Sequence, residues 1–330
     1  MRISQLSKAV KLAYRANQPV MLWGKPGVGK SSVVSQVCND EKIGFIDLRL
    51  SLLEPIDLRG LPTIEKKVTS WSRPDFLPIS GKGILFLDEL VQAAPSMQAG
   101  ASQLILDRRL GEYKLPAGWV PMAAGNQSQH KSATNAMPRH LANRFIHLYA
   151  EESVDDWVLW ALANDIDIRV IAFIKFRNPL LCNFDPTVKG EAYATPRSWE
   201  FVSNLLKAGM NGDLLLDMVQ GAVGPAAASE FVGFLRVYER MPNPDAVILN
   251  PGDAEIPSDA SALAALSMAL VTKASETTVA AILQYFTRVA EAARPEFSVM
   301  VAREIVARTP KLQNTKAFIT WAAKHNAILV

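Results

Sequence analysis

Residues 19–37 read PVMLWGKPGVGKSSVVSQV, an apolar run followed by a glycine-rich turn and then by a helix-forming segment. This order is typical of a strand, a phosphate-binding loop and a helix. Residues 24–31 fit the spacing G-x-x-x-x-G-K-[ST]. Glycines let backbone N–H groups converge on phosphate oxygens, and the new helix adds the positive end of its dipole. A glycine-rich turn that fits by accident is the alternative, and the strand and helix signals around the loop disfavour it.

The residue types in this loop predict the chemistry of a bound nucleotide. Lys30 is expected to reach the β- and γ-phosphates, and the Ser31 hydroxyl is expected to be a Mg²⁺ ligand. The predicted cofactors are therefore ATP and Mg²⁺. The residues expected to contact the nucleotide are Gly24, Pro26, Gly27, Val28, Gly29, Lys30, Ser31 and Ser32.

A second apolar run, GILFLDE at residues 83–89, ends in two adjacent acids. Its consecutive large apolar residues predict a strand buried on both faces, as in a parallel sheet. Asp88 is expected to hold Mg²⁺ through water, and Glu89 is expected to polarise the attacking water. An acid pair at a strand end is common by itself. Together with the phosphate loop, it predicts a site that hydrolyses ATP.

A further strand is predicted over residues 119–126, and it ends at Asn126. The Asn126 amide is a candidate for orienting the same water that Glu89 polarises, although an Asn at a strand end is often only a turn residue. The position of Asn126 after the two acids in the chain favours the catalytic interpretation.

Three arginines are candidates for contacting phosphate. Arg139 and Arg144 lie on a short predicted helix that runs into a last strand, and residues five apart are separated by about 140° on a helix. Only one of them can therefore point at a given phosphate, and Arg144, at the helix-to-strand junction, is the preferred candidate. Arg197 falls in the first turn of a helix that starts at Thr195-Pro196, where a cation opposes the helix dipole. Its anionic partner is either a surface acid or a γ-phosphate.

The bulk properties of the chain describe an ordinary globular protein. With 330 residues, of which 49% are hydrophobic, two or three domains are expected. The predicted divisions are residues 1–150, 151–245 and 246–330, the latter two helical. Cys38 and Cys182 are isolated, and no leader or membrane span is apparent, so a soluble, cytoplasmic protein is expected. The net charge of +3 neither requires nor excludes a nucleic-acid partner.

Taken in order, these motifs resemble the AAA+ ATPases over about residues 1–210. They are the phosphate loop, LDE at 87–89, Asn126, NRF at 143–145 and TPR at 195–197. DLRG at 57–60 and a predicted hairpin before Asn126 resemble the MoxR-like branch. The resemblance implies an α/β fold: an AAA+ αβα P-loop domain with a parallel five-stranded sheet, an α-helical lid and a C-terminal helical extension. The part of the chain beyond about residue 251 resembles no known family pattern.

The same resemblance implies roles for the later residues. Asn126 takes the sensor-1 role and Arg197 the sensor-2 role in their own subunit. Arg144 is the arginine finger that a neighbouring subunit presents to ATP, in a homo-hexameric ring. Proteins of this branch commonly work with a partner carrying a von Willebrand factor A domain, as chaperone-like remodellers. Two hairpins are predicted, a short one within the insertion at residues 54–78 and a second at residues 110–118, and by this resemblance both would face the pore or a partner.

Three functions are compatible with this sequence. An ATP-driven remodeller of a protein partner is preferred. A nucleic-acid motor of the helicase or restriction-translocase kind is the alternative, supported by Lys66-Lys67 near Trp71. A nucleotide switch without turnover is the third. Trp71 itself is expected to be a core anchor, with an aromatic that grips a partner from a mobile loop as the other interpretation.

Overall fold

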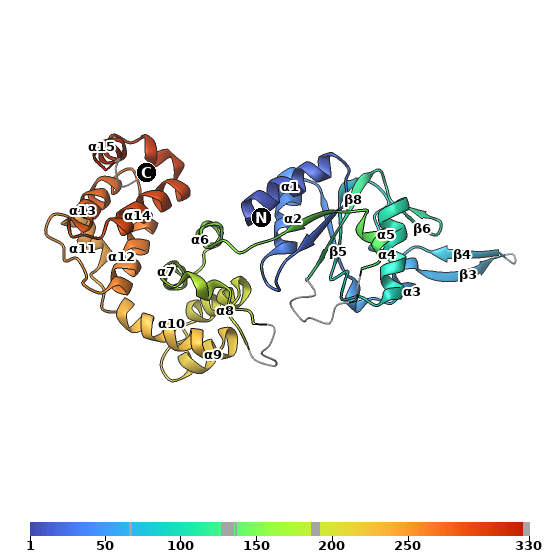
Figure 1. The fold of residues 1–330 in the computed structure, drawn as a ribbon, viewed down its shortest axis with the longest axis horizontal. Helices are drawn as coiled ribbons and strands as arrows, with labels where there is room; N and C mark the ends of the chain where they lie inside the picture. Colours follow the sequence, from blue (N-terminus) through green and yellow to red (C-terminus); the bar gives the residue numbers. More distant parts are fainter. Residues whose placement is uncertain (66–67, 127–134, 136, 186–191, 326–330) are drawn as a thin grey trace. The chain divides into compact units, whose positions relative to one another are not determined.

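The computed structural model describes residues 1–65, 68–126, 135, 137–185 and 192–325 (Figure 1). The chain divides into two compact units. Met1–Ser153 make up nearly all of the first unit, and the second contains Val154–Asn183 and the described residues from 192 onward. Among the described residues, no helix combines the length and the apolar character that crossing a bilayer requires.

A five-stranded sheet forms the centre of the first unit, with the strand order β2-β5-β8-β1-β9 and parallel pairing throughout. This confirms the predicted parallel sheet. Its order places the strand that precedes the phosphate loop beside the strand that ends near Asn126. The strands are β1 (Val20–Trp23), β2 (Gly44–Arg49), β5 (Lys82–Asp88), β8 (Gly118–Gly125) and β9 (Ile146–Tyr149).

Helices cover both faces of this sheet because successive strand residues point to opposite sides. Ile84 and Phe86 of β5 pack in one cluster with residues of α1 (Ile3–Arg15) and α2 (Lys30–Glu41). Leu85 and Leu87 belong to the opposite cluster, which includes residues of α4 (Pro95–Asp107). The uninterrupted apolar run of β5 is therefore explained by burial on both sides.

Two hairpins leave the first unit, as the turn signals predict. The longer, β3 (Leu61–Glu65) with β4 (Val68–Ser72), follows the short helix α3 (Pro55–Arg59) (Figure 1). Trp71 lies outside the core clusters and is half-buried, with the Arg59 guanidinium 4.0 Å from its ring centroid. The expectation of a core anchor is therefore wrong, because a two-stranded ribbon covers neither of its own faces.

The remaining elements of the first unit are the 3₁₀ helix η1 (Leu50–Leu52), β6 (Arg109–Leu110), β7 (Tyr113–Lys114) and α5 (Arg139–Ala142).

The second unit is helical. One apolar cluster is built around the packed aromatic rings of Phe173, Trp199 and Phe231, and another joins the helices nearer the C-terminus. The elements are α6 (Val154–Ala163), α7 (Ile168–Phe176), η3 (Asn178–Leu181), α8 (Pro196–Lys207), α9 (Leu214–Val223), α10 (Pro225–Tyr238), α11 (Pro244–Leu249), α12 (Ala260–Thr272), α13 (Val279–Glu291), α14 (Pro295–Arg308), η4 (Pro310–Asn314) and α15 (Lys316–Lys324).

Helix α12 belongs to both apolar clusters of this unit. Ala265 and Met268 pack in the first, and Leu263 and Leu266 pack in the second. Because α12 is buried on more than one side, the segments predicted as a lid and a C-terminal bundle form one compact unit. The boundary that the sequence predicts between the lid and the C-terminal bundle, near residue 245, lies within α11. Pro244 is the first residue of that short helix, a position at which proline is well tolerated.

Candidate nucleotide site

The phosphate loop connects β1 to α2 with the backbone that its glycines permit. Gly27 and Gly29 have φ values of +74° and +98°, the left-handed region that other residues enter only with strain. Gly29 is the N-cap of α2, and Lys30 is its first residue. The first N–H groups of α2, which have no acceptor within the helix itself, therefore lie next to the loop, which is the arrangement that binds phosphate.

Lys30 connects the loop to the neighbouring strand. Its Nζ donates to the carbonyl oxygens of Gly24 at 2.9 Å and Lys25 at 3.0 Å, and to Oδ1 of Asn126 at 2.9 Å. Asn126 directly follows β8, which pairs with β1. The two residues predicted from separate motifs thus lie in hydrogen-bonding contact.

The two predicted metal ligands also lie together. Ser31 Oγ donates to Oδ2 of Asp88 at 3.2 Å, while Oδ1 of Asp88 accepts from the backbone N–H of Glu89 at 2.9 Å. Partial desolvation, followed by the negative charges of Asp88 and Glu89, raises the pKa of Asp47 on the adjacent strand. A divalent cation at this acidic end of the sheet would relieve that repulsion, so the donor set fits Mg²⁺.

Glu89 has a strained backbone and a side-chain partner. Its φ is +57°, which costs a residue with a Cβ on the order of 1–2 kcal/mol. The Ser51 hydroxyl donates to the Glu89 carboxylate. Ser51 lies on η1, immediately after β2, and the pairing of β2 with β5 brings it to the acid. Ser51 cannot be predicted from the sequence, because a serine in the run LRLSLLE gives no local signal of this contact.

We expect Ser51→Ala to lower the rate constant for ATP turnover about 10- to 100-fold, because a hydrogen bond to a charged group contributes roughly 1.5–3 kcal/mol and here orients Glu89. ATP affinity should stay unchanged, since Ser51 lies outside the phosphate loop. Ser51→Thr keeps the hydroxyl and serves as the matched control. Steady-state kinetics with a separate nucleotide titration distinguish the two effects, and an unchanged turnover in Ser51→Ala would refute the orienting role.

The three candidate arginines are all exposed, but they lie in different places. Arg139 is the first residue of α5, and Arg144 lies in the turn between α5 and β9. Arg197 lies in the first turn of α8 in the second unit, where the Thr195 side chain caps the helix as predicted. The structure thus joins Lys30, Ser31, Asp88, Glu89 and Asn126 in one site and leaves the arginines on the surface.

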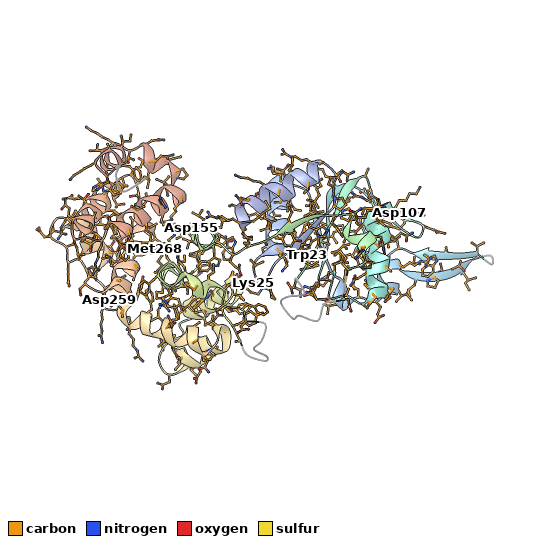
Figure 2. All side chains as sticks on the ribbon, in the orientation of Figure 1. Trp23, Lys25, Asp107, Asp155, Asp259 and Met268 are labelled. Carbon is orange, nitrogen blue, oxygen red and sulfur yellow. The ribbon has the colours of Figure 1, made fainter. Side chains whose placement is uncertain are left out.

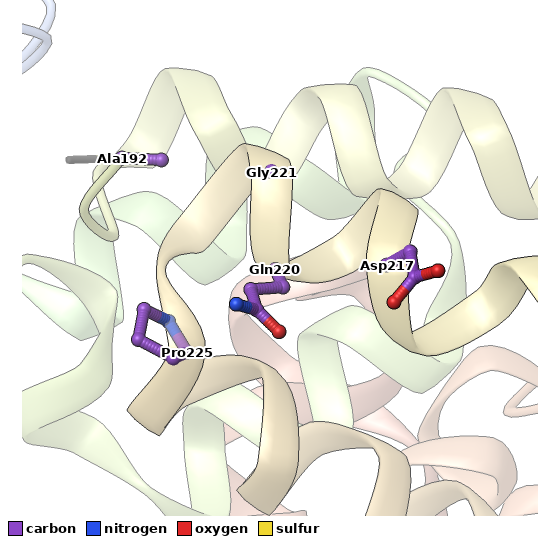
Figure 3. A pocket seen from close by; sticks show the side chains of 5 residues that line it. All are labelled: Ala192, Asp217, Gln220, Gly221 and Pro225. Carbon is purple, nitrogen blue, oxygen red and sulfur yellow. The ribbon is translucent and has the colours of Figure 1, made fainter.

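A hollow of about 510 Å³ is found elsewhere, near the start of α10 in the second unit (Figure 3). Asp217 and Gln220 are its polar side chains, and the other lining residues are Ala192, Gly221 and Pro225. None of the predicted site residues lines it. The candidate site is therefore defined by its side chains and loop geometry, and not by this hollow.

The fold and these contacts define a P-loop nucleotide-binding domain. Residues 20–148 match the family described as ATPase family associated with various cellular activities (AAA). This match reaches all five strands of the sheet and contains the phosphate loop, so this part of the chain is similar to the ATPase domains of that family.

Individual proteins are similar to parts of this chain. Midasin of Giardia intestinalis is 30% identical over 176 residues, 49% of this chain and 4% of Midasin. The replication factor C large subunit of Ignicoccus hospitalis is 32% identical over 87 residues, 26% of this chain and 17% of that protein. The chain thus spans less than a fifth of either relative.

Solved structures also align with the chain. NtrX from Brucella abortus in complex with ADP is 14% identical with a TM-score of 0.43, over 99% of this chain and 68% of that one. A mutant of RuvB from Thermotoga maritima is 14% identical with a TM-score of 0.43, over 76% of this chain and 75% of that one.

Proposed function

We propose that this protein is a MoxR-like AAA+ ATPase that couples hydrolysis of ATP to the remodelling of a protein partner. The convergence of Lys30 with Asn126, and of Ser31 with Asp88, carries the catalytic part of the proposal. Four residues from three separate motifs meet at one end of the parallel sheet, where ligands of such folds bind. A structural role alone would not require a lysine, an amide, a hydroxyl and a carboxylate at this one place.

Each of these residues has a distinct task. The loop N–H groups and Lys30 bind the phosphates, and Lys30 neutralises charge on the terminal one. Ser31 and Asp88 would hold Mg²⁺, which supplies further charge neutralisation on the phosphates. Glu89 accepts a proton from the attacking water, and Asn126 orients that water. Lys30 must leave the Gly24 and Lys25 carbonyls to reach the nucleotide.

The exposure of Arg144 supports its proposed role as an arginine finger. A finger that acts on a neighbour's nucleotide must extend from its own subunit, and Arg144 is exposed in a turn between two ordered elements. In this proposal the protein forms a homo-hexameric ring, and each nucleotide is bound by one subunit and completed by the next. Arg197, also exposed, takes the sensor-2 role in its own subunit.

The β3–β4 hairpin supports a protein partner. Leu61, Ile64 and Val68 are 63%, 80% and 66% exposed. The register places Leu61 and Val68 on one face of the hairpin and Ile64 on the other. Exposed apolar side chains on both faces of a ribbon are available for contact with a protein partner. We propose that the partner contains a von Willebrand factor A domain, as the MoxR-like resemblance implies.

A nucleic-acid motor is the second candidate. Arg109 and Lys114 lie directly opposite each other on the β6–β7 hairpin, and both are exposed. Two cations at this register position repel each other unless an anion lies between them. Lys66 and Lys67, which favour the same candidate, lie outside the described residues.

The test of the proposed function is ATP turnover measured against protein concentration. We expect the rate per subunit to rise as subunits assemble, because the finger comes from a neighbour. Addition of nucleic acid at low salt should leave the rate unchanged. A concentration-independent rate in a monomer would overturn the ring mechanism, and strong stimulation by nucleic acid that salt abolishes would favour the motor.

A further inference from the structure

The chain that follows β9 packs directly on the phosphate loop. The backbone N–H of Ala150 donates to the carbonyl of Trp23 at 2.7 Å, so the segment continues alongside the end of β1. A Cβ added to Gly24 would lie 3.1 Å from the Cβ of Ala150 and 3.2 Å from its carbonyl oxygen. Residues 150–152 therefore lie against the first residues of the loop, and Ser153 ends this part of the first unit.

An ion pair joins this segment to the loop. Lys25 Nζ lies 2.7 Å from Oε1 of Glu152, and the two side chains are 36% and 23% exposed (Lys25 is labelled in Figure 2). The pair is therefore partly shielded from solvent. Lys25 is one of the variable positions in the motif spacing, and Glu152 lies outside every motif considered above.

Lys25 also contacts Lys30, the lysine expected to bind the phosphates. The Lys25 carbonyl accepts from Lys30 Nζ at 3.0 Å, while its side chain pairs with Glu152. A chain of polar contacts thus runs from Asn126 through Lys30 and Lys25 to Glu152. Movement of Lys30 toward a phosphate breaks its hydrogen bond to the Lys25 carbonyl, so this carbonyl then needs another donor.

We propose that the ion pair between Lys25 and Glu152 lowers the affinity of the loop for ATP, and that binding of ATP in turn weakens this ion pair. The inference rests on the proposed function only in taking ATP as the ligand. The triphosphate brings several negative charges to the loop, which attract Lys25 and repel the Glu152 carboxylate. Coupling between two binding events is reciprocal. If ATP weakens the pair, removal of the Glu152 charge must strengthen binding of ATP.

The test is a titration of ATP and ADP by fluorescence or calorimetry with four variants. Glu152→Gln should tighten ATP binding about three- to tenfold, and ADP binding less, because ADP carries less charge. Lys25→Gln should weaken ATP binding by a similar factor, since it leaves Glu152 to repel the phosphates. The ATP affinity of the double variant should lie between those of the two single variants. Glu151→Gln, at the exposed neighbouring acid, is the matched control and should bind as the unaltered protein does.

Hydrogen exchange at the amides of residues 150–153 gives a second readout. We expect exchange there to speed up when ATP binds, and to be fast in Glu152→Gln without nucleotide. Equal ATP affinities in Glu152→Gln and Glu151→Gln would overturn this inference and leave the proposed function standing. Absence of ATP binding in the unaltered protein would overturn the proposed function instead, so the two failures are distinguishable.

Discussion

Glu89→Gln is expected to lower ATP turnover by about 10²–10⁴-fold while ATP binding is retained. The amide matches the carboxylate in size, so the turn at Glu89 and its contact with Ser51 are disturbed little. It cannot accept a proton from water at neutral pH, which removes the general base. Phosphate release measures the turnover, and a nucleotide titration measures the binding.

The control for this variant is Glu276→Gln, at an exposed acid in the second unit. It makes the same chemical change away from the site and should hydrolyse ATP at the unaltered rate. If Glu89→Gln also hydrolyses ATP at that rate, Glu89 is not the base. If both variants bind ATP and the unaltered protein shows no turnover, the protein is a nucleotide switch.

Arg144→Ala is expected to lower hydrolysis by the assembled protein about 10³-fold, because an arginine finger stabilises negative charge that develops on the transferred phosphate. Binding of ATP should change little, since the loop and Lys30 are unaltered. Arg139→Ala removes an exposed arginine from α5, the short helix just before the turn that contains Arg144, and is the matched control. Turnover is measured at a concentration at which both variants are assembled.

A mixing experiment shows whether Arg144 acts on a neighbour. Subunits with Arg144→Ala keep Glu89, and subunits with Glu89→Gln keep Arg144, so a mixed ring contains some complete sites. We expect the mixture to recover activity that neither variant has alone. If mixing restores nothing, or if Arg139→Ala shows the larger loss, Arg144 is not a finger that acts in trans.

The agreement between sequence and structure is greatest where the signal is local. The β1 strand, the glycine turn and α2 follow one another within 22 residues, and each has a pattern that short-range forces explain. The two acids could be assigned because β5 is buried on both faces, which leaves an apolar run with a sharp end. Thr195 is recognisable as a cap from the sequence because capping involves only its near neighbours.

The missed residues depend on pairing between distant parts of the chain. Ser51 meets Glu89 only because β2 lies beside β5, and no pattern around Ser51 records that neighbour. Trp71 reads as a core residue by composition, yet a ribbon open on both sides leaves it stacked with Arg59. The ion pair of Lys25 with Glu152 joins residues that are 127 positions apart.

The sequence alone therefore predicted the chemical groups of the candidate site, apart from Ser51, and the order of the strands along the chain. Motif spacing and hydrophobic periodicity follow from the fixed geometry of the backbone, so they can be recognised in the sequence without the tertiary structure. Only the tertiary structure decided which side chains meet. Hydrogen bonds and ion pairs act over a few ångströms, and the order of strands in the sheet sets which of the predicted residues, such as Lys30 and Asn126, come within that range.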